Sequence, residues 1–452
     1  MRIVSPEKGV GGVRINKLAK MMIGVEDVVV EGVGFDGARQ AVVIDARPRK
    51  PQACRCGRCG RRAPRYDGGR GARLWRCCDL AGTMVYVRCE AFRVRCPDCG
   101  VTVRAVPWAD HGSWFTRAFE DTCCWCALSM SKLACQRLMR VSWRTVGAIC
   151  ARVEARLSEG RPPRTEGLAR IGVDETSYRR GQRYMTVVVN HDTGAVVWCH
   201  DGHGRRVLDS FFASLTQEQR DAIELVSADG ARWVDSSMAE WVPRATRCVD
   251  TFHVVQWATD LLDEVRRQAW REASAEARAA SGRAAGRGAG AGKRSAAERA
   301  SAAGRAADAA RGLRWALLKN PEDLTARQAA DLELAAASNP RLHRAYLLKE
   351  GLRLALRLPA DQIRDAVEAW RGRAWRSRIP EFVKLQRKVK RHLDAIVATA
   401  RHGLTNARVE AVNNKIKLIV KMAYGFRNVD NLFAMVMLKC SDLVVELPGR
   451  SV

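Results

Sequence analysis

The sequence predicts a multidomain α/β protein. An N-terminal zinc-binding β module and a helix-turn-helix should precede a mixed sheet that is interrupted by an α-helical insertion. Three observations predict this class: cysteines cluster between Cys54 and Cys99, helical periodicity begins near Trp114, and strand-like apolar runs alternate with helical patterns beyond residue 166. A chain of 452 residues has room for roughly two to four domains.

The charge of the chain points to a polyanionic partner. Its 77 Lys and Arg residues outnumber 49 Asp and Glu residues and leave +28 formal charges; nucleic acid is the commonest partner of so basic a protein. Because the chain has no run of about 18 apolar residues, we expect no membrane span. The first residues lack the apolar segment of a secretory signal, so we expect a cytoplasmic protein, or a nuclear one if its source has a nucleus.

The first half of the chain begins with a β-rich segment, residues 1–50, in which "EDVVVEGVGF" and "QAVVIDARPR" predict a hairpin. Residues 51–106 hold two C-x-x-C knuckles, each followed by Gly, and the runs between them alternate like strands. Two such knuckles supply the four thiolates of a tetrahedral structural Zn²⁺ site. The expected ligands are Cys56, Cys59, Cys96 and Cys99.

Two alternatives to this zinc site remain open. The cysteines of the knuckles would be unligated if the segment were only a basic β-hairpin. A different ligand set would include one of the spare cysteines, which are Cys54, Cys77, Cys78 and Cys89.

Residues 107–160 are predicted to form a helix-turn-helix. In "SMSKLACQRLMRVSWRTVGAICARV" a helix, a turn at 139–141 and a second helix capped by Ser142 follow one another. The second helix should bury Val146, Ile149 and Val153. Its first residues would enter the major groove of DNA; these are Trp143, Arg144 and Thr145. The alternative is a pair of packed helices with no role in DNA binding.

Beyond the polar boundary at 159–167, the chain reads strand–strand–strand–helix–strand–helix–strand over residues 166–264, as in a mixed α/β sheet. Residues 265–400 read as a helical insertion punctuated by prolines. It contains an Ala/Arg/Gly-rich stretch at 273–312, which we interpret as a basic linker flanked by helix. Residues 401–452 are expected to complete the α/β core.

Three widely separated acids form the candidate catalytic site. Asp174 ends the apolar run "LARIGV" and Asp229 ends "IELVSA", so both should lie at one edge of the sheet. Glu410 lies on a predicted helix that begins after Thr405 or Asn406 and runs to about residue 423. Carboxylates around two Mg²⁺ or Mn²⁺ ions are the usual apparatus of phosphodiester chemistry.

The helix that carries Glu410 has two distinct faces. Val409, Val412, Ile416 and Ile419 form an apolar stripe. The opposite polar face continues from Glu410 at helical spacing with residues suited to holding a phosphate backbone. These candidate DNA-binding residues are Asn414, Lys417 and Lys421.

Three neighbouring polar residues are weighed separately. Asp250 also follows an apolar run and is a candidate fourth ligand, or a substitute for Asp229. His253 would either position a phosphate or, as we favour, cap a helix or satisfy a core hydrogen bond. Glu175 should point to the opposite side of the strand from Asp174.

In these motifs the chain resembles the ISL-three family of DDE transposases of bacterial insertion sequences. The segments that carry the resemblance are "RCPDCG", "IGVDETSYRRGQRYMTVVV", "VSADGARW", "CVDTFHVVQWATDLLDEVRR", "ALLKNPEDLT" and "TNARVEAVNNKIKLIVKMAYGFRN". The resemblance implies a ribonuclease-H-like core with a helical insertion before the final acid. It also implies Asp174, Asp229 and Glu410 as the catalytic triad.

The resemblance implies a transposase that binds the terminal inverted repeats of its element and cleaves and joins double-stranded DNA. By analogy it would act on element ends and target DNA as a homodimer or higher oligomer. Two alternatives are a catalytically inactive, zinc-containing, sequence-specific DNA-binding protein and a nuclease that cuts without joining. The first predicts binding without Mg²⁺-dependent cleavage, and the second predicts cleavage without strand transfer.

Overall fold

A computed structural model describes residues 14–285 and 312–450 of the chain, together with isolated positions between them. Residues 1–13 of the predicted β-rich segment and most of 286–311, in the Ala/Arg/Gly-rich stretch, lie outside the described residues. The chain divides into two compact units, which are described separately. The first unit comprises Met1–Pro162 and Asn414–Val452, and the second comprises Pro163–Asn413.

The first unit contains a four-stranded sheet with the order β1-β2-β5-β4. The predicted hairpin is present, because β1 (Val28–Asp36) and β2 (Ala41–Pro48) pair antiparallel. β2 also pairs in parallel with β5 (Thr83–Glu90), which is antiparallel to β4 (Ala72–Leu80). Residues 1–50 and the cysteine-rich segment therefore share one sheet.

A helix that sequence reading did not anticipate precedes this sheet. In α1 (Ile15–Ile23), Ala19 and Ile23 lie four residues apart and are buried in the same core as Ile44 and Trp75. The helix exists because its i, i+4 apolar pair is covered by the sheet.

Three helices follow the cysteine-rich segment: α2 (Arg117–Ser129), α3 (Lys132–Met139) and α4 (Trp143–Ser158). The turn between α3 and α4 lies where it was predicted. Arg140 adopts a left-handed conformation with φ 52°, and Ser142 Oγ accepts a hydrogen bond from Thr145 N at 3.1 Å. Val146, Ile149 and Val153 are buried, as expected from their spacing.

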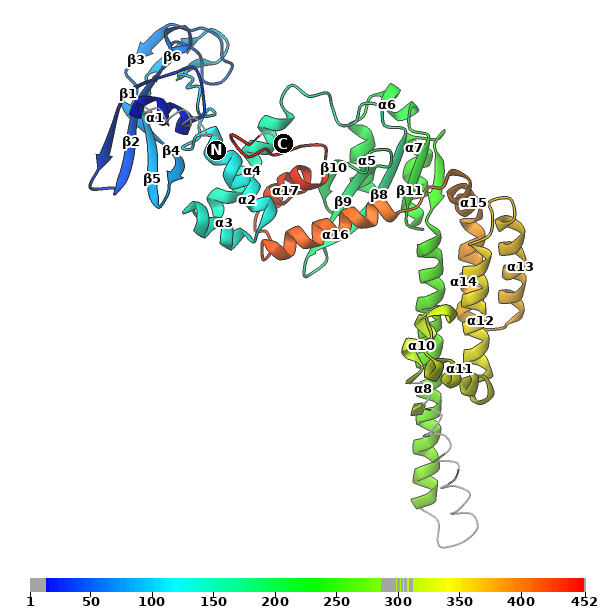
Figure 1. Cartoon of the computed structure of the whole chain (residues 1–452). Coiled ribbons are helices and arrows are strands. Elements are labelled where there is room, and N and C mark those ends of the chain that lie inside the picture. The colour runs from blue at the N-terminus through cyan, green and yellow to red at the C-terminus, as the bar shows by residue number, and fades with distance from the viewer. Residues whose placement is uncertain are drawn as a thin grey trace, which may run out of the picture. The chain divides into compact units, whose positions relative to one another are not determined.

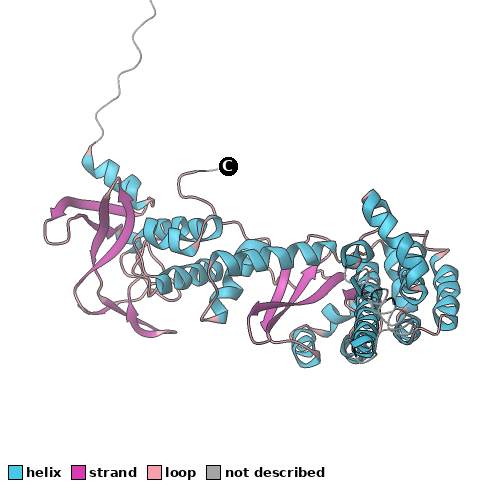
Figure 2. Cartoon of the chain, turned by 90° about the horizontal axis from the view of Figure 1, so that it is seen from below, coloured by secondary structure: helices cyan, strands magenta, loops and turns pink. Residues whose placement is uncertain are grey.

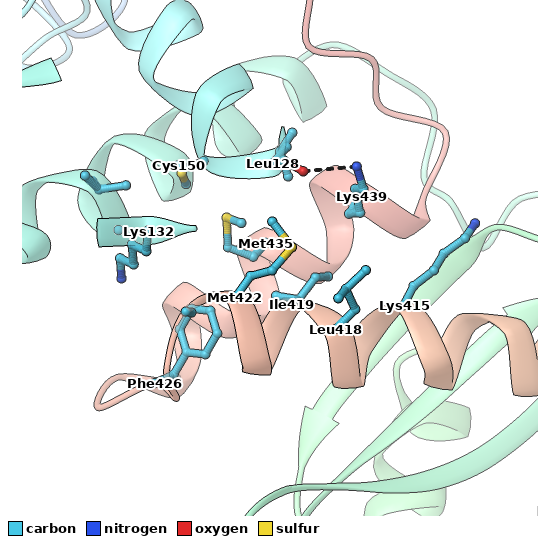
Figure 3. Close-up of a pocket in the computed structure, with 14 residues that line it drawn as sticks. Leu128, Lys132, Cys150, Lys415, Leu418, Ile419, Met422, Phe426, Met435 and Lys439 are labelled. Carbon is cyan, nitrogen blue, oxygen red and sulfur yellow. Dashed lines mark hydrogen bonds between the residues drawn. The ribbon is translucent and has the colours of Figure 1, made fainter. Parts of the chain in front are cut away.

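The C-terminal residues differ from the expected boundary, because residues 414–452 group with the first unit rather than with the sheet of the second unit. α17 (Val429–Cys440) packs against α4, and a Cβ at Gly147 would meet Asn431 Nδ2 at 2.5 Å. Figure 3 shows the small apolar cavity of about 50 Å³ within this unit, with Lys439 bonded to the Leu128 carbonyl beside it.

The second unit is built on a five-stranded sheet with the order β10-β9-β8-β11-β12. β8 (Arg170–Arg179), β9 (Arg183–Asn190) and β10 (Val196–Asp201) form an antiparallel meander. β11 (Leu225–Ala228) and β12 (Thr246–Val249) run parallel to β8. The predicted order of strands and helices is present, and the strands are magenta in Figure 2.

Helices cover both faces of this sheet. α5 (Arg205–Ala213) and α7 (Arg232–Trp241) share a core with Ile171 and Val173 of β8, while the short α6 (Gln217–Asp221) lies between them in the chain. The other face is covered by α15 (Leu393–His402) and the start of α16 (Ala407–Met422). There Thr399 Oγ1 donates to the Val249 carbonyl at 2.9 Å.

The insertion between the two parts of the sheet region is helical, as predicted, but its first helix begins at Thr251 rather than near 265. Pro340 and Pro380 occupy first-turn positions of two of its helices. Figure 1 shows the insertion helices beside α8. The described helices of the insertion are α8 (Thr251–Ala285), α10 (Arg314–Leu318), α11 (Ala326–Ser338), α12 (Pro340–Ala355), α13 (Ile363–Arg376) and α14 (Pro380–Arg391). No helix among the described residues is both long and apolar enough to cross a membrane.

Candidate active site and metal centre

Asp174 lies inside β8 rather than at its end, because antiparallel pairing with β9 continues to Arg179. The parallel pairing of β8 with β11 nevertheless stops at Gly172. The edge of β8 that faces β11 is therefore unpaired at Asp174. Asp174 Oδ1 accepts from Glu175 N at 2.8 Å, and Oδ2 accepts from Asn413 Nδ2 at 2.6 Å.

Asp229 follows β11 directly, as predicted, and is exposed. Its Oδ1 accepts from Ala231 N at 3.1 Å. Burial raises the pKa of Asp174 above its ordinary value and the charge of Asp229 raises it further, while bonds from Glu175 and Asn413 and the imidazole of His253 offset part of the rise. The structure thus brings the two aspartates close enough to repel each other.

Glu410 lies on the exposed face of α16, three residues before Asn413. At about 1.5 Å of rise per residue, its Cα is about 5 Å along the helix axis from the residue that contacts Asp174. The three acids do not form a closed ligand set: among the described residues, the only group of three or more His, Cys, Asp or Glu residues with ligand atoms within 4.8 Å of one another consists of four cysteines.

The remainder of α16 matches the predicted two faces. The apolar stripe is buried, with exposed fractions of 6% or less. The polar face is exposed and consists of Glu410, Asn414, Lys417 and Lys421.

A buried polar network fixes the start of α16 to the sheet. Ser227 Oγ of β11 donates to Asn406 Oδ1 at 2.6 Å and lies 2.6 Å from His191 Nε2. Because Ser227 uses its proton on Asn406, the imidazole donates to it. Burial lowers the pKa of His191 to about 4, so this imidazole is neutral.

Gly172 allows the close approach of α16 to β8. A Cβ there would lie 2.4 Å from Val409 Cγ2 and 2.7 Å from His191 Nε2. Only a residue without a side chain leaves room for this contact, so the helix can place Asn413 against Asp174.

Asp250 is buried between the start of α8 and the start of α16. It is 6% exposed, and its two oxygens accept backbone N–H groups, Oδ1 from Phe252 at 2.9 Å and Oδ2 from Asn406 at 3.1 Å. Asp250 therefore caps α8 and holds the residue before α16. Its carboxylate is already engaged on both sides.

His253 and Glu175 lie near the aspartates in different ways. His253, in the first turn of α8, is half-buried and interacts electrostatically with Asp174. Glu175 Oε1 accepts from Gly204 N at 2.7 Å, at the start of α5. Glu175 therefore points to the opposite face of the sheet from Asp174, as the alternation of a strand predicts.

The two knuckles meet in a separate cluster in the first unit. The Sγ atoms of Cys56, Cys59, Cys96 and Cys99 all lie within 4.8 Å of one another. The Cys96 knuckle joins β6 (Arg93–Cys96) to β7 (Gly100–Val103), and these strands form a small sheet with β3 (Arg65–Asp67).

The backbone around the knuckles suits a bound metal. Gly60 and Gly100, which follow the knuckles, both have φ of +71°, a conformation that favours glycine. Burial opposes ionisation of Cys56, but N–H groups of Cys59 and Arg58 and neighbouring thiols lower the pKa of Cys56 to about 7. Four thiols with one stabilised as thiolate match the donor set of a structural zinc site.

The spare cysteines lie outside this cluster. Cys77 Sγ donates to the Met22 carbonyl at 3.2 Å, Cys78 Sγ lies 3.6 Å from Thr122 Oγ1, and Arg104 Nη2 donates to Cys89 Sγ at 2.9 Å. Cys54 is exposed.

The predicted DNA-reading residues of α4 differ in how free they are. Arg144 is exposed. Thr145 Oγ1 lies 2.7 Å from Ser142 Oγ, and the half-buried Trp143 ring has Lys132 Nζ 4.6 Å from its centroid. Arg144 is therefore the most exposed member of the trio.

Sequence reasoning missed Asn413, Asn406, His191 and Gly172. One signal was available for Asn413: it lies four residues after Val409 and three before Ile416, so a polar side chain occupies a position of the buried stripe. A polar residue at a buried helical position needs a partner. The identity of that partner, Asp174, could not be read locally.

The chain is strongly basic, has a four-cysteine cluster in one unit, and carries two neighbouring aspartates on the sheet of the other. These are features of DNA-processing proteins. The ISL3-type DDE family model, described as "Transposase", matches residues 171–436. The transposase for insertion sequence element IS1557 of Mycobacterium tuberculosis is 46% identical over 441 residues, 96% of this chain and 97% of that protein. The transposase for element IS1001 of Bordetella parapertussis is 26% identical over 345 residues, 75% of this chain and 78% of that protein. The chain belongs to the ISL-three family of transposases.

Proposed function

We propose that this transposase cleaves and joins DNA with a metal-dependent site formed by Asp174, Asp229 and Glu410. The observation that carries the proposal is that α16 is bonded to Asp174 through Asn413, while Asp229 is close enough to raise the pKa of Asp174. This contact supports the assignment of Glu410, because Glu410 lies three residues before Asn413 on the same helix.

The donor set fits divalent cations. Asp174 and Asp229 repel each other, and a cation between them would relieve that repulsion. Asn413 Oδ1 is buried without a hydrogen-bond partner among the described residues. Carboxylate and amide oxygens are ligands that Mg²⁺ and Mn²⁺ accept, and two such ions would activate the attacking oxygen and stabilise the leaving oxygen.

The sheet supports a ribonuclease-H-like core for this chemistry. An antiparallel meander with two further strands parallel to its first strand places Asp174 and Asp229 on neighbouring strands. The exposed position of Glu410 leaves its carboxylate free to turn toward them when cations bind.

The first unit is proposed to recognise the terminal inverted repeats. The cysteine cluster would hold a structural Zn²⁺, and the α3–α4 pair would act as a helix-turn-helix with Arg144 at a base edge. Cleavage and joining of two ends implies a homodimer or higher oligomer on DNA.

The proposal is tested on a duplex carrying the ends that flank the gene of this protein. With Mg²⁺, the wild-type protein should produce nicked and then joined products. Asp174→Asn, Asp229→Asn and Glu410→Gln should each abolish both products while leaving the Kd for the ends within roughly threefold of wild type. Full activity in any of the three would remove that residue from the triad.

Two further outcomes separate the alternatives. Tight binding to the ends with no Mg²⁺-dependent product from wild-type protein would identify an inactive DNA-binding relative. Nicking without joined product, under conditions in which target DNA is supplied, would identify a nuclease.

A further inference from the structure

Lys388, on α14 of the helical insertion, lies close to the loop that carries Asp229. Its Nζ is 3.5 Å from the ring centroid of Trp257 on α8. The edge of the same ring meets Gly230, where a Cβ would lie only 2.3 Å from Trp257 Cζ2. Because residue 230 is a glycine, the Trp257 ring can pack against it. Lys388, which lies on that ring, is therefore close to the residue that follows Asp229.

The charge of Lys388 is only partly solvated. Burial lowers the pKa of Lys388, and the negative charge of Asp229 opposes that effect. No salt bridge joins Lys388 to a carboxylate in the part of the chain that the structure describes. A cation resting on an aromatic face keeps N–H donors that the ring does not use.

Lys349, also in the insertion, is a buried lysine with a structural role and serves for comparison. Lys349 is 2% exposed, and its Nζ donates to the carbonyls of Leu317 and Lys319, each at 3.1 Å, and pairs with Glu350. Lys388 has no comparable set of oxygen partners among the residues that the structure describes. Its free donors and its position beside Asp229 suit an oxyanion that arrives from outside.

We propose that Lys388 is a positioning residue that binds a phosphate of the DNA strand held at Asp229, so that the helical insertion contributes directly to the active site. The proposal rests on the proposed function, because it needs DNA at Asp229. The acids of the site repel the phosphate backbone, and a cation held by Trp257 offsets this repulsion on the side of the insertion. The aromatic face also restricts the lysine, which reduces the cost of ordering it.

The test compares Lys388→Gln with Lys390→Gln, which removes the same charge from an exposed position on the same helix. For Lys388→Gln, the slope of log Kd against log salt concentration should fall by about 0.9, as expected for one lost phosphate contact. Its cleavage rate at saturating DNA with Mg²⁺ should fall roughly tenfold or more, because the strand is less well placed. Lys390→Gln should keep the wild-type cleavage rate.

Two further variants guard against a folding defect. Lys388→Met keeps the apolar stem against Trp257 and should cleave as poorly as Lys388→Gln, with a melting temperature near that of wild type. Lys388→Arg keeps the charge and should recover most of the salt dependence.

The outcomes separate this inference from the proposed function. If Asp174→Asn is inactive but Lys388→Gln and Lys388→Met match Lys390→Gln in cleavage rate and salt slope, the role of Lys388 is refuted and the active site stands. If Asp174→Asn cleaves like wild type, the proposed function fails first. A lowered melting temperature with unchanged slope and rate would show that Lys388 only holds α14 against α8.

Discussion

Asn413 Nδ2 donates a 2.6 Å hydrogen bond to Oδ2 of Asp174, and these two residues are 239 positions apart in the chain. The bond joins the helix that carries Glu410 to the central strand of the sheet. Because its acceptor is a carboxylate, it is stronger than a neutral hydrogen bond. It therefore both positions α16 and favours the ionised form of Asp174.

Replacing Asn413 by Ala should weaken catalysis and shift its pH dependence. Loss of a bond to the ionised form raises the pKa of Asp174 further above its ordinary value, so the acidic limb of the pH–rate profile should move to higher pH. The cleavage rate at neutral pH should fall roughly tenfold or more, and half-maximal activity should need more Mg²⁺. Rates measured across pH and Mg²⁺ concentration test this.

The neighbouring Asn414 is the matched control, since it is exposed on the polar face of the same helix. Asn414→Ala is expected to change DNA affinity without moving the acidic limb. A pH–rate profile of Asn413→Ala that superimposes on the wild-type profile would contradict the role given to this bond.

Asp174→Asn should change how the stability of the metal-free protein depends on pH. The folded state raises the pKa of Asp174 above 3.8, so it binds that proton more tightly than the unfolded chain. The resulting destabilisation is absent below 3.8, grows as pH rises through the raised pKa, and is fully present above it. The melting temperature of the variant relative to wild type should therefore rise between acid and neutral pH. This rise adds to a pH-independent loss, because an amide can accept only one of the two N–H groups that Asp174 accepts.

Thermal unfolding in the presence of a chelator measures this effect, with Asp361→Asn as a control at an exposed position. Addition of Mg²⁺ should raise the melting temperature of wild type more than that of Asp174→Asn. A difference in melting temperature between Asp174→Asn and wild type that stays constant from acid to neutral pH would argue against the repulsion inferred for the two aspartates.

Gly172→Ala should separate α16 from β8. The added Cβ would overlap Val409 and the His191 imidazole, and overpacking of this kind costs about 1–3 kcal/mol. Urea unfolding should report that loss, and DNA cleavage should fall because Asn413 no longer reaches Asp174. Gly34→Ala in β1 is the control, since a Cβ there has no neighbour within 4 Å. Equal stability and activity of the two variants would show that the contact at Gly172 is tolerant.

Cys96→Ser should remove a stoichiometric metal ion. Atomic absorption should find about one Zn²⁺ per wild-type chain and close to none in the variant. Binding to the element ends should weaken, because the small sheet of β3, β6 and β7 loses the ion that joins its knuckles. Cys54→Ser, at an exposed cysteine outside the cluster, should keep both the metal and the binding. Unchanged metal content in Cys96→Ser would exclude the zinc site.

Much of this architecture could be predicted from the sequence, because it depends on interactions between residues that are close together in the chain. The hairpin of β1 and β2, the turn before Ser142 and the buried stripe of α16 all follow from local periodicity and capping. The two knuckles were equally clear, because C-x-x-C followed by Gly specifies a local turn whatever lies elsewhere. Each of these features is decided within about a dozen residues.

The site itself required the folded chain. The hydrogen-bond partners of Asp250 could not be read from the sequence, because its oxygens accept from Phe252 and from Asn406, which is distant in the chain. Asp174 was expected at a strand end, but pairing with β9 extends β8 beyond it. Both outcomes depend on which strand or helix arrives beside the residue.

The sequence by itself determined that this chain has a thiol-rich β module, a capped helix pair, a mixed sheet and an acid-bearing amphipathic helix. Only the tertiary structure decided that β2 pairs with β5, that residues 414–452 join the first unit, and that Asn413 meets Asp174. Local periodicity specifies which face of an element is apolar. It does not specify which distant surface will cover that face, because that choice depends on shape and polar pairing between residues far apart in the chain.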